Sequence, residues 1–326
     1  MILAGDIGGT KVNLALYDEE DDSNLVVLHE FYSKEFFSFE ALIDKFKKKY
    51  SEYKITKACL AIAGPIIEQR CKTTNLPWDI KQSDLQKQLG IEEVKLLNDL
   101  EATAYGMLYA KEDTFVDLNS HGREAKGNIA VIAAGTGLGE AILCFDGKEY
   151  YPMASEGGHC DFAPLTSQQD ELLRWARDRY KGHVSVERVV SGMGISTIYD
   201  FLVDTQYASE PNFMQTLTKE QDKSAMISKG AMEFHDKLCK ETMKLFCEIY
   251  AQEAGNLALK AMAVGGVLIG GGIAPKILSL LQDEVFIDSF LSKGRFEELL
   301  RGMKVRVCLD DKTALMGAAK FALDKF

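Results

Sequence analysis

The sequence predicts an α/β protein built from two domains that share a cleft. Two stretches, residues 2–17 and 129–145, repeat one pattern: an aliphatic strand, a turn containing glycine and threonine, and a second strand. After the first of these hairpins, strand-like and helix-like periodicities alternate, which is typical of a mixed sheet covered by helices. The length of 326 residues also exceeds the usual size of a domain with a single core.

In the first half we expect a strand meander that leads into strand–helix alternation. Phe39, Leu42, Ile43 and Phe46 recur with a period of three to four residues and indicate a helix. The expected strands are 2–7, 11–17, 25–32, 58–63 and 94–97, and the expected helices are 38–50, 83–89 and 100–110.

The second half restarts the same order and then carries a mainly helical insertion. The expected strands are 129–134, 139–145, 148–153, 264–269 and 304–308, with helical insertion 168–262 and a last helix at 312–323. Within the insertion, residues 231–262 form the clearest amphipathic helix, with Phe234, Leu238 and Leu245 in its apolar stripe. We expect a small domain of residues 1–110 plus 309–326 and a large α+β domain of residues 111–308.

The overall composition excludes several classes of protein. Hydrophobic residues make up 46% of the chain, and the formal net charge of −11 has the wrong sign for neutralising nucleic-acid phosphates. Seven scattered cysteines without a CxxC pair favour buried thiols in a reducing compartment over disulfides or zinc. Met1 leads directly into the first strand, and no apolar run is long enough for a membrane span. We expect a cytoplasmic protein with neither nucleic acid nor a membrane as partner.

The glycine turns predict phosphate binding. In GDIGGTK (5–11), Thr10 stands where a Walker loop needs glycine, and a strand follows where Walker and Rossmann loops need a helix. The motif is better interpreted as a β-hairpin phosphate clamp in which Asp6 holds a hydrated Mg²⁺, although a purely structural hairpin would have the same glycines. A second such turn at GTGLG (135–139) and a third at GGGIAP (270–275) favour a bound nucleotide. The third lacks Cβ atoms, so a flat ring or a ribose fits against its backbone.

Asp99 is the candidate proton acceptor. It follows the strand 94–97, and ligands of α/β proteins usually bind at the carboxyl edge of the sheet. Asp99 can accept a proton from a substrate hydroxyl, while Asn98 orients that hydroxyl. Both residue types are also favoured helix N-caps, so a structural role stays open.

Polar segments further along the chain suit a sugar. Two glycines between Glu156 and His159 allow a sharp turn that points both side chains at one spot. A metal site there is disfavoured because no second ligand cluster is suitably spaced. Glu187 is either a further polar ligand or a surface ion-pair partner of Arg188 or Arg179.

An earlier loop, residues 73–78, combines an amide with an aromatic ring. Asn75 and Trp78 suit the face of a sugar, but a single Trp is more often a core anchor.

Taken in order, these segments resemble the bacterial glucokinase family, in its branch without zinc. The resemblance covers essentially the whole chain and lies in GDIGGTKVNLAL, AIAGPI, TNLPW, LLNDLEA, AAGTGLGEA, EGGHCDFAP, GHVSVERVVSG, AGNLAL, GGVLIGGGIAPK and KGRF. One departure is Lys11, where close bacterial glucokinases commonly have asparagine.

The resemblance implies a ribonuclease-H-like (actin-like ATPase) fold with a central cleft. It implies transfer of a phosphoryl group from ATP, with Mg²⁺, to the 6-hydroxyl of glucose, and a homodimer. It assigns Asp99 as general base and Asp6 as the residue that positions Mg²⁺ through water. The implied sugar ligands are Asn98, Glu156, His159 and Glu187, and the implied nucleotide ligands are Gly8, Gly9, Thr10, Thr136, Gly137, Gly271 and Gly272.

Two alternatives stay open. One is a kinase for another hexose, such as mannose or an N-acetylhexosamine. The other is a non-catalytic sugar sensor, which is disfavoured because Asp99 is present and because no helix-turn-helix sequence precedes the first strand.

Overall fold

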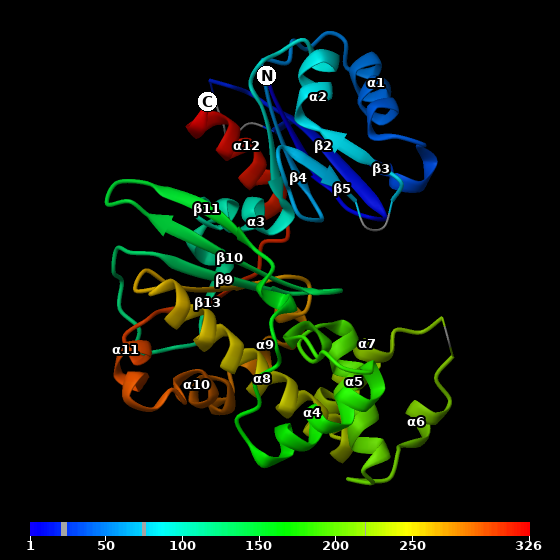
Figure 1. Ribbon diagram of the computed structural model, residues 1–326, viewed down its shortest axis with the longest axis vertical. Coiled ribbons are helices and arrows are strands. Elements are labelled where there is room, and N and C mark those ends of the chain that lie inside the picture. Colours follow the sequence, from blue (N-terminus) through cyan, green and yellow to red (C-terminus); the bar gives the residue numbers. More distant parts are fainter. Residues whose placement is uncertain (21–24, 74–75, 219) are drawn as a thin grey trace. The chain divides into compact units, whose positions relative to one another are not determined.

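The computed structural model describes residues 1–20, 25–73, 76–218 and 220–326. The chain divides into two compact units (Figure 1). Unit 1 comprises Met1–Glu112, Ala141–Ala154 and Asp310–Phe326, and unit 2 comprises Asp113–Glu140 and Ser155–Leu309. The domain limits expected from the sequence stay a prediction.

Unit 1 is built on a five-stranded mixed sheet in the order β3-β2-β1-β4-β7. Its strands are β1 (Ile2–Ile7), β2 (Lys11–Tyr17), β3 (Leu25–Tyr32), β4 (Lys57–Ile62) and β7 (Val94–Asn98). β2 runs antiparallel to β1 and β3, whereas β1, β4 and β7 are parallel to one another. The first three strands have the bounds expected from the sequence. A separate two-stranded ribbon pairs β5 (Arg70–Lys72) with β6 (Asp79–Lys81).

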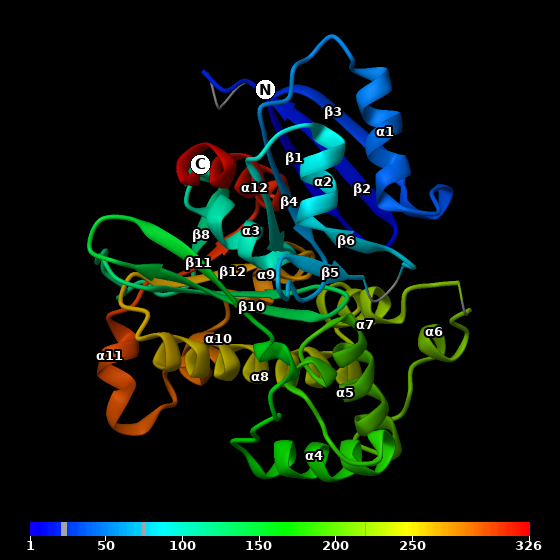
Figure 2. The ribbon, with the colours of Figure 1, turned by 45° about the horizontal axis from the view of Figure 1, so that its top comes forward.

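Helices cover both faces of this sheet because side chains of successive strand residues alternate between the faces. Leu3 packs with α1 (Phe39–Lys49) and α2 (Gln82–Leu89), while its neighbour Ile2 packs with α3 (Asp99–Met107) and α12 (Thr313–Lys325). Figures 1 and 2 show these two helix pairs on opposite faces of the sheet.

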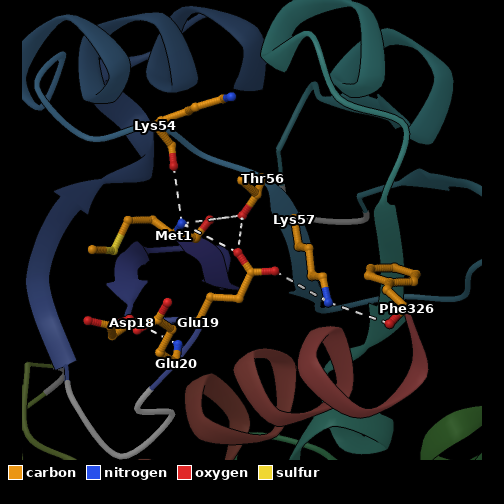
Figure 3. Close-up of polar contacts among 8 residues, drawn as sticks. All are labelled: Met1, Asp18, Glu19, Glu20, Lys54, Thr56, Lys57 and Phe326. Atoms are coloured by element: carbon orange, nitrogen blue, oxygen red, sulfur yellow. Dashed lines mark hydrogen bonds and ion pairs between the residues drawn. The ribbon is translucent and has the colours of Figure 1, made fainter.

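A polar cluster joins four segments of unit 1 at the start of β1 (Figure 3). The Thr56 hydroxyl donates to Glu19 Oε2 over 2.7 Å, and the Met1 amino group lies 3.9 Å from the same oxygen. Lys57 Nζ pairs with Glu19 Oε1 at 3.5 Å and donates to the carbonyl oxygen of Phe326 at 3.5 Å. The bond from Thr56 is the main reason that the pKa of Glu19 is lowered. The cluster therefore connects β1, β4 and the end of α12.

Unit 2 contains a sheet segment in the order β9-β12-β13-β8, in which only the last pair is antiparallel. These strands are β9 (Ile129–Ala134), β12 (Gly266–Gly270), β13 (Val305–Cys308) and β8 (Phe115–Asp117). β10 (Leu138–Phe145) starts in unit 2, and its later residues are grouped with unit 1, as is most of β11 (Tyr150–Ser155).

The long helix α8 (Lys237–Ala261) is the centre of the core of unit 2, and its Leu238, Leu245 and Ile249 are buried. It packs against β9, α5, α7 and α10. The other helices are α4 (Ser167–Tyr180), α5 (Gly192–Asp204), α6 (Asn212–Gln215), α7 (Lys223–Met232), α9 (Leu278–Leu281), α10 (Glu284–Leu291) and α11 (Glu297–Arg301). Among the described residues, no helix combines the length and the apolar character that crossing a membrane requires.

The expected single helix at 231–262 is wrong at its start. α7 ends at Met232, and α8 begins after Asp236, whose side chain caps it by accepting from the Cys239 N–H over 2.9 Å. Between the two helices His235 adopts a left-handed conformation, and Phe234 is half exposed instead of belonging to the buried stripe. An Asp directly before a helical run is a start signal. In this segment the start signal of Asp236 outweighs the apolar periodicity, which continues across it.

α3 and α12 pack at unusually close range within unit 1. A Cβ atom at Gly317 would overlap the carbonyl oxygen of Ala102, and one at Gly106 would overlap that of Thr313. Each helix therefore contributes a glycine at the point where the other helix's backbone passes.

We expect Gly317→Ala to lower the free energy of unfolding by about 1–3 kcal/mol, because the added methyl group forces the two backbones apart. The measurement is a urea titration of the purified protein followed by circular dichroism. Gly302→Ala is the control, since a Cβ there meets its nearest atom at an ordinary 3.5 Å. Equal stability of the Gly317 variant and wild type would contradict the close packing.

Candidate functional site

The first glycine turn joins β1 to β2 and is braced from a neighbouring segment. Gly8 N–H donates to the carbonyl oxygen of Lys11 over 2.9 Å. Ser33, just after β3, donates from its hydroxyl to Gly8 O and from its N–H to Thr10 O, both over 3.0 Å. Gly9 lies between these anchored residues, so the turn has a fixed shape.

Asp6 lies in β1 directly before this turn, opposite Asn13 of β2. Burial is the largest influence on its carboxyl group and raises its pKa, and a hydrogen bond with the Asn13 side chain partly offsets this effect. A buried carboxylate whose charged form is destabilised binds a cation readily, because the cation supplies the missing stabilisation.

Asn98 and Asp99 lie where β7 ends and α3 begins. Asn98 is the N-cap, and its side-chain oxygen accepts from the Leu100 N–H over 2.9 Å. Glu101 completes a capping box by accepting from the Asn98 N–H over 2.8 Å. The Asn98 amide also donates to Gly64 O over 3.1 Å. The N-cap interpretation is thus confirmed for Asn98, and Asp99 occupies the first helical position.

Asp6 and Asp99 lie at the same edge of the sheet. The register pairs Asp6 with Ala61 of β4 and Ala61 with Leu97 of β7, two residues before Asp99. Because the three strands are parallel and neighbouring strands are spaced about 4.8 Å apart, the backbones of Asp6 and Leu97 are about 10 Å apart. This carboxyl edge is the usual ligand-binding edge of an α/β sheet.

Two other residues of unit 1 have structural partners. Lys11 Nζ donates to Glu30 Oε2 over 2.9 Å across the hairpin. Trp78 is buried, and its indole N–H donates to Phe36 O over 3.3 Å, as a core anchor does. Asn75, a predicted sugar ligand, lies outside the described residues.

The second glycine turn, in unit 2, is held by the start of α5. Gly135 N–H donates to Gly137 O over 2.8 Å, and Gly192 N–H donates to Gly135 O over 2.9 Å. Ser191 caps α5 with its side chain, which accepts from the Gly194 N–H. This places Thr136 at the tip of a turn that the N-terminal, electropositive end of a helix supports.

A cavity of ≈ 680 Å³ opens beside this turn. It is lined by Gly135 and Thr136, the first residues of α5, one side of α7, and the segment 272–277. This volume lies in the range of small-molecule and cofactor sites. The cavity therefore brings together residues of the second and the third glycine turns, as expected for a nucleotide site.

The third glycine turn shows why two of its glycines are required for different reasons. Gly271 has a φ of +82°, and a Cβ atom there would overlap the carbonyl oxygen of Ala134. At Gly272, which lines the cavity, a Cβ atom would meet nothing within 4 Å. Gly271 thus maintains the fold, while Gly272 leaves room for a ligand.

Glu156 and His159 are brought together as expected. They flank a short turn, Gly157–His159, in which both glycines are buried. His159 Nε2 lies 4.0 Å from Glu156 Oε2, and both side chains are more than half exposed. A carboxylate and an imidazole are thus presented side by side to a polar ligand.

Glu187 belongs to a segment that pairs with the one carrying Glu156 and His159. Phe162 N–H donates to Val184 O over 2.9 Å, and Val186 N–H donates to Cys160 O over 2.9 Å. These two bonds form an isolated antiparallel bridge between residues 160–162 and 184–186. It fixes the distance from Glu187 to the turn at 157–159.

The Glu187 carboxylate accepts from the Leu138 N–H over 3.0 Å and lies against Gly137. The alternative of an ion pair with Arg179 or Arg188 gains no support, since Arg179 pairs with Asp200 at 2.7 Å and Arg188 stacks on Tyr180. Glu187 therefore connects the segment next to Glu156 and His159 to the second glycine turn.

These features are typical of a phosphoryl-transfer enzyme, which works by positioning and charge neutralisation. They are two glycine turns, acidic residues at one sheet edge, and a cavity beside the start of a helix. The chain belongs to the glucokinase family, which it matches over residues 3–325. This family is the one that the sequence resembles.

Individual relatives agree with the family match. The chain is 40% identical to a glucokinase of Nostoc punctiforme over 98% of both chains. It is similar in structure to a glucokinase from an Antarctic psychrotroph, with a TM-score of 0.83 and 32% identity over 98% of this chain and 97% of that one. A glucokinase of Balamuthia mandrillaris, solved in complex with glucose, shares the fold with a TM-score of 0.78 at 20% identity, covering 98% and 93%. The predicted fold class is confirmed.

Several cavity residues were not predicted from the sequence. Gly192, Ser224 and Lys276 line the cavity from three different segments. Their positions depend on how α5 and α7 pack around α8, and no local motif encodes that packing. Gly192 could have been predicted from the sequence, because it directly follows Ser191, a residue type that often caps a helix.

The raised pKa of Asp6 gives a testable consequence for stability. In the unfolded chain this carboxyl group has its ordinary pKa of about 3.8. Between that pH and the higher folded-state pKa, the folded protein binds more protons, so stability falls as pH rises through this window. At neutral pH the full penalty of a buried charge is present.

We therefore expect Asp6→Asn to melt at a higher temperature than wild type at pH 7.5, without added nucleotide or divalent cation. Asparagine is uncharged and keeps a hydrogen-bonding partner for Asn13. The gain should shrink as pH falls toward 4.5, as measured by scanning calorimetry. Asp178→Asn, at an exposed position of α4, is the control and should show no such trend. A lower melting temperature of Asp6→Asn at pH 7.5 would argue against the buried charge.

Proposed function

We propose that this protein transfers the terminal phosphoryl group of ATP to the 6-hydroxyl of glucose, with Asp99 as the general base. The observation that carries the assignment of the base is the position of Asp99, next to the capping residue Asn98 at the carboxyl edge that also holds Asp6. Glucose as the substrate is supported by the family and by the full-length similarity to glucokinases.

Asp99 is suited to act as a base because it is half-buried at the first position of α3. The carboxylate accepts the proton of the 6-hydroxyl as the oxygen attacks phosphorus, and the new O–P bond forms while the bond to the leaving ADP oxygen breaks. The capping box fixes the backbone from which this side chain projects.

Asp6 is the residue that positions Mg²⁺. Mg²⁺ keeps several water ligands and takes one or two carboxylates together with substrate phosphates, so a single buried carboxylate fits it. When bound, Mg²⁺ neutralises charge on the phosphates. Gly8 shapes the first turn, in which the backbone N–H groups of Gly9 and Thr10 bind phosphate oxygens. Thr136 and Gly137 do the same in the second turn, and the cavity bordered by Gly272 receives the adenosine.

The other sugar hydroxyls bind Asn98, Glu156, His159 and Glu187. The first of these has one amide hydrogen and one lone pair beyond its two bonds inside the protein. Glu156 and His159 are exposed and adjacent, so they can contact neighbouring hydroxyls of one ring. Selectivity follows because a sugar that lacks a matching hydroxyl leaves a polar group without a partner. Asn75 stays a proposed ligand on sequence grounds.

The wider context of the proposal is a cytoplasmic, homodimeric enzyme at the entry of glucose into glycolysis. Seven free cysteines, five of them buried, fit a reducing compartment. Twofold-symmetric dimers are the commonest assemblies of soluble enzymes.

The proposed function is tested by an assay of the purified protein with ATP, Mg²⁺ and, in turn, glucose, mannose, fructose and N-acetylglucosamine, following hexose phosphate and ADP. We expect selective formation of glucose 6-phosphate. Higher kcat/KM on another sugar would replace glucose as the substrate, and binding of glucose without turnover of any sugar would indicate a sensor.

The role of Asp99 is tested with Asp99→Asn. Asparagine can still accept from the Leu100 N–H, as Asp99 does over 2.9 Å, so the helix start is preserved. We expect kcat to fall by about 10²- to 10⁴-fold because the proton acceptor is lost, while glucose binding measured by calorimetry stays near that of wild type. Asp84→Asn serves as the control with unchanged kcat. Near-normal turnover of Asp99→Asn would exclude Asp99 as the base.

A further inference from the structure

Two buried carboxyl groups in unit 2 have no part in the chemistry described so far. Glu140, in β10, is 2% exposed, and Glu253, in α8, is 5% exposed. Their side chains are hydrogen bonded to each other. Two ionised carboxylates offer only acceptors, so this bond requires a proton on one of them.

The surroundings place the proton on Glu140. Glu253 accepts from the Asn256 side-chain amide over 2.9 Å, and Lys260 Nζ lies 3.6 Å from its other oxygen. Glu140 has no such cationic neighbour at ion-pair distance in the described part of the chain. Apart from the contact between the two carboxyl groups, Glu140 Oε1 and Glu253 Oε1 have no hydrogen-bond partner among the described residues. A charge on Glu140 would therefore be poorly compensated.

Glu140 lies directly against the turn that presents Glu156 and His159. The space that a side chain at Gly157 would need is filled by Glu140 Oε2. The space beside Gly158 is filled by the carbonyl oxygen of Leu138, in the same strand. The absence of side chains at Gly157 and Gly158 therefore allows residues 138–140 to pack directly against the backbone of the turn. A displacement of the Glu140 carboxyl group would displace the backbone at Gly157.

We propose that protonated Glu140 is a positioning residue for the glucose-binding turn at 156–159, and that loss of its proton weakens glucose binding. This inference rests on the proposed function, because it takes Glu156 and His159 to be sugar ligands. Glu140 touches neither substrate and acts only through the backbone of Gly157.

The surroundings of Glu140 favour loss of its proton near neutral pH. Burial first, and the Glu253 carboxylate second, raise the pKa of Glu140 to about 7, and Lys260 opposes them. Two further titratable groups interact with this pair: Tyr250 of α8 with Glu140, and Lys293 with Glu253. The Lys293 ammonium donates to Gln252 O and to Asn256. Burial lowers the pKa of Lys293.

Deprotonation removes the hydrogen bond between the two carboxyl groups and puts two like charges side by side. Glu253 is restrained by Asn256 and Lys260, so Glu140 is the group that moves, and Gly157 occupies its other side. Displacement of the turn changes the spacing between Glu156 and His159 and therefore the affinity for the sugar. The affinity for ATP changes less, because other segments line the ATP cavity.

The test compares wild type with Glu140→Gln, which cannot ionise and keeps a hydrogen-bond donor for Glu253. KM is measured for glucose and for ATP from pH 6.0 to 8.5. We expect the wild-type KM for glucose to rise about three- to tenfold over this range, with KM for ATP nearly constant. In Glu140→Gln the KM for glucose should stay near the low-pH value of wild type.

Two further variants make the result decisive. Glu253→Gln removes one cause of the raised pKa, so the rise in KM should move to lower pH. Glu298→Gln, at an exposed position of α11, should behave as wild type. Should Glu140→Gln fail to fold, the shift in Glu253→Gln decides the matter alone.

Identical pH profiles in wild type and Glu140→Gln, or an unshifted profile in Glu253→Gln, would overturn the positioning role. This failure is distinguishable from a failure of the proposed function. In the latter case the wild-type protein would not phosphorylate glucose at any pH, and the inference would fall with it.

Discussion

The first three residues of β10 hold together the site segments of unit 2. Leu138 donates its N–H to Glu187, and its carbonyl oxygen fills the space beside Gly158. Two residues on, the Glu140 side chain fills the space beside Gly157. A single stretch of extended backbone therefore sets the positions of the phosphate-type turn before it, of Glu187 and of the turn that carries Glu156 and His159. A side chain at position 157 or 158 would collide with this stretch, so glycine at both positions allows the turn to pack against β10.

Function and stability are opposed at two places in this chain. Asp6 and Glu140 are both carboxyl groups whose pKa is raised mainly by burial, so each makes the folded state less stable at neutral pH than an uncharged residue would. Such groups persist where the site needs them, and the surrounding sheet and helices supply the compensating stability. In Asp6 the uncompensated charge is available to a cation, whereas in Glu140 the proton itself supplies the compensation.

Much of the fold could be predicted because its signals are local. The aliphatic runs around GDIGGTK and GTGLG define strands, and the glycines define the turns between them, so β1, β2, β3 and β9 have the expected bounds. The start of α8 was predicted wrongly, since apolar residues on both sides of Asp236 imitate one continuous helix. The contact of Glu187 with Leu138 and the contribution of α7 to the cavity could not be predicted, because both depend on segments about 50 or more residues apart packing around α8.

The close packing of α3 against α12 has a consequence for how the chain folds during synthesis. Residues 1–112 contain all five strands of the first sheet and α3, but α12, the second helix on the face of Ile2, is made about 200 residues later. At ordinary elongation rates this delay lasts roughly 10 to 40 seconds, during which Ile2, Ala4 and their neighbours lack the cover that α12 provides. The nascent chain thus exposes an apolar surface to the ribosome exit region, where a chaperone that binds apolar segments has time to act.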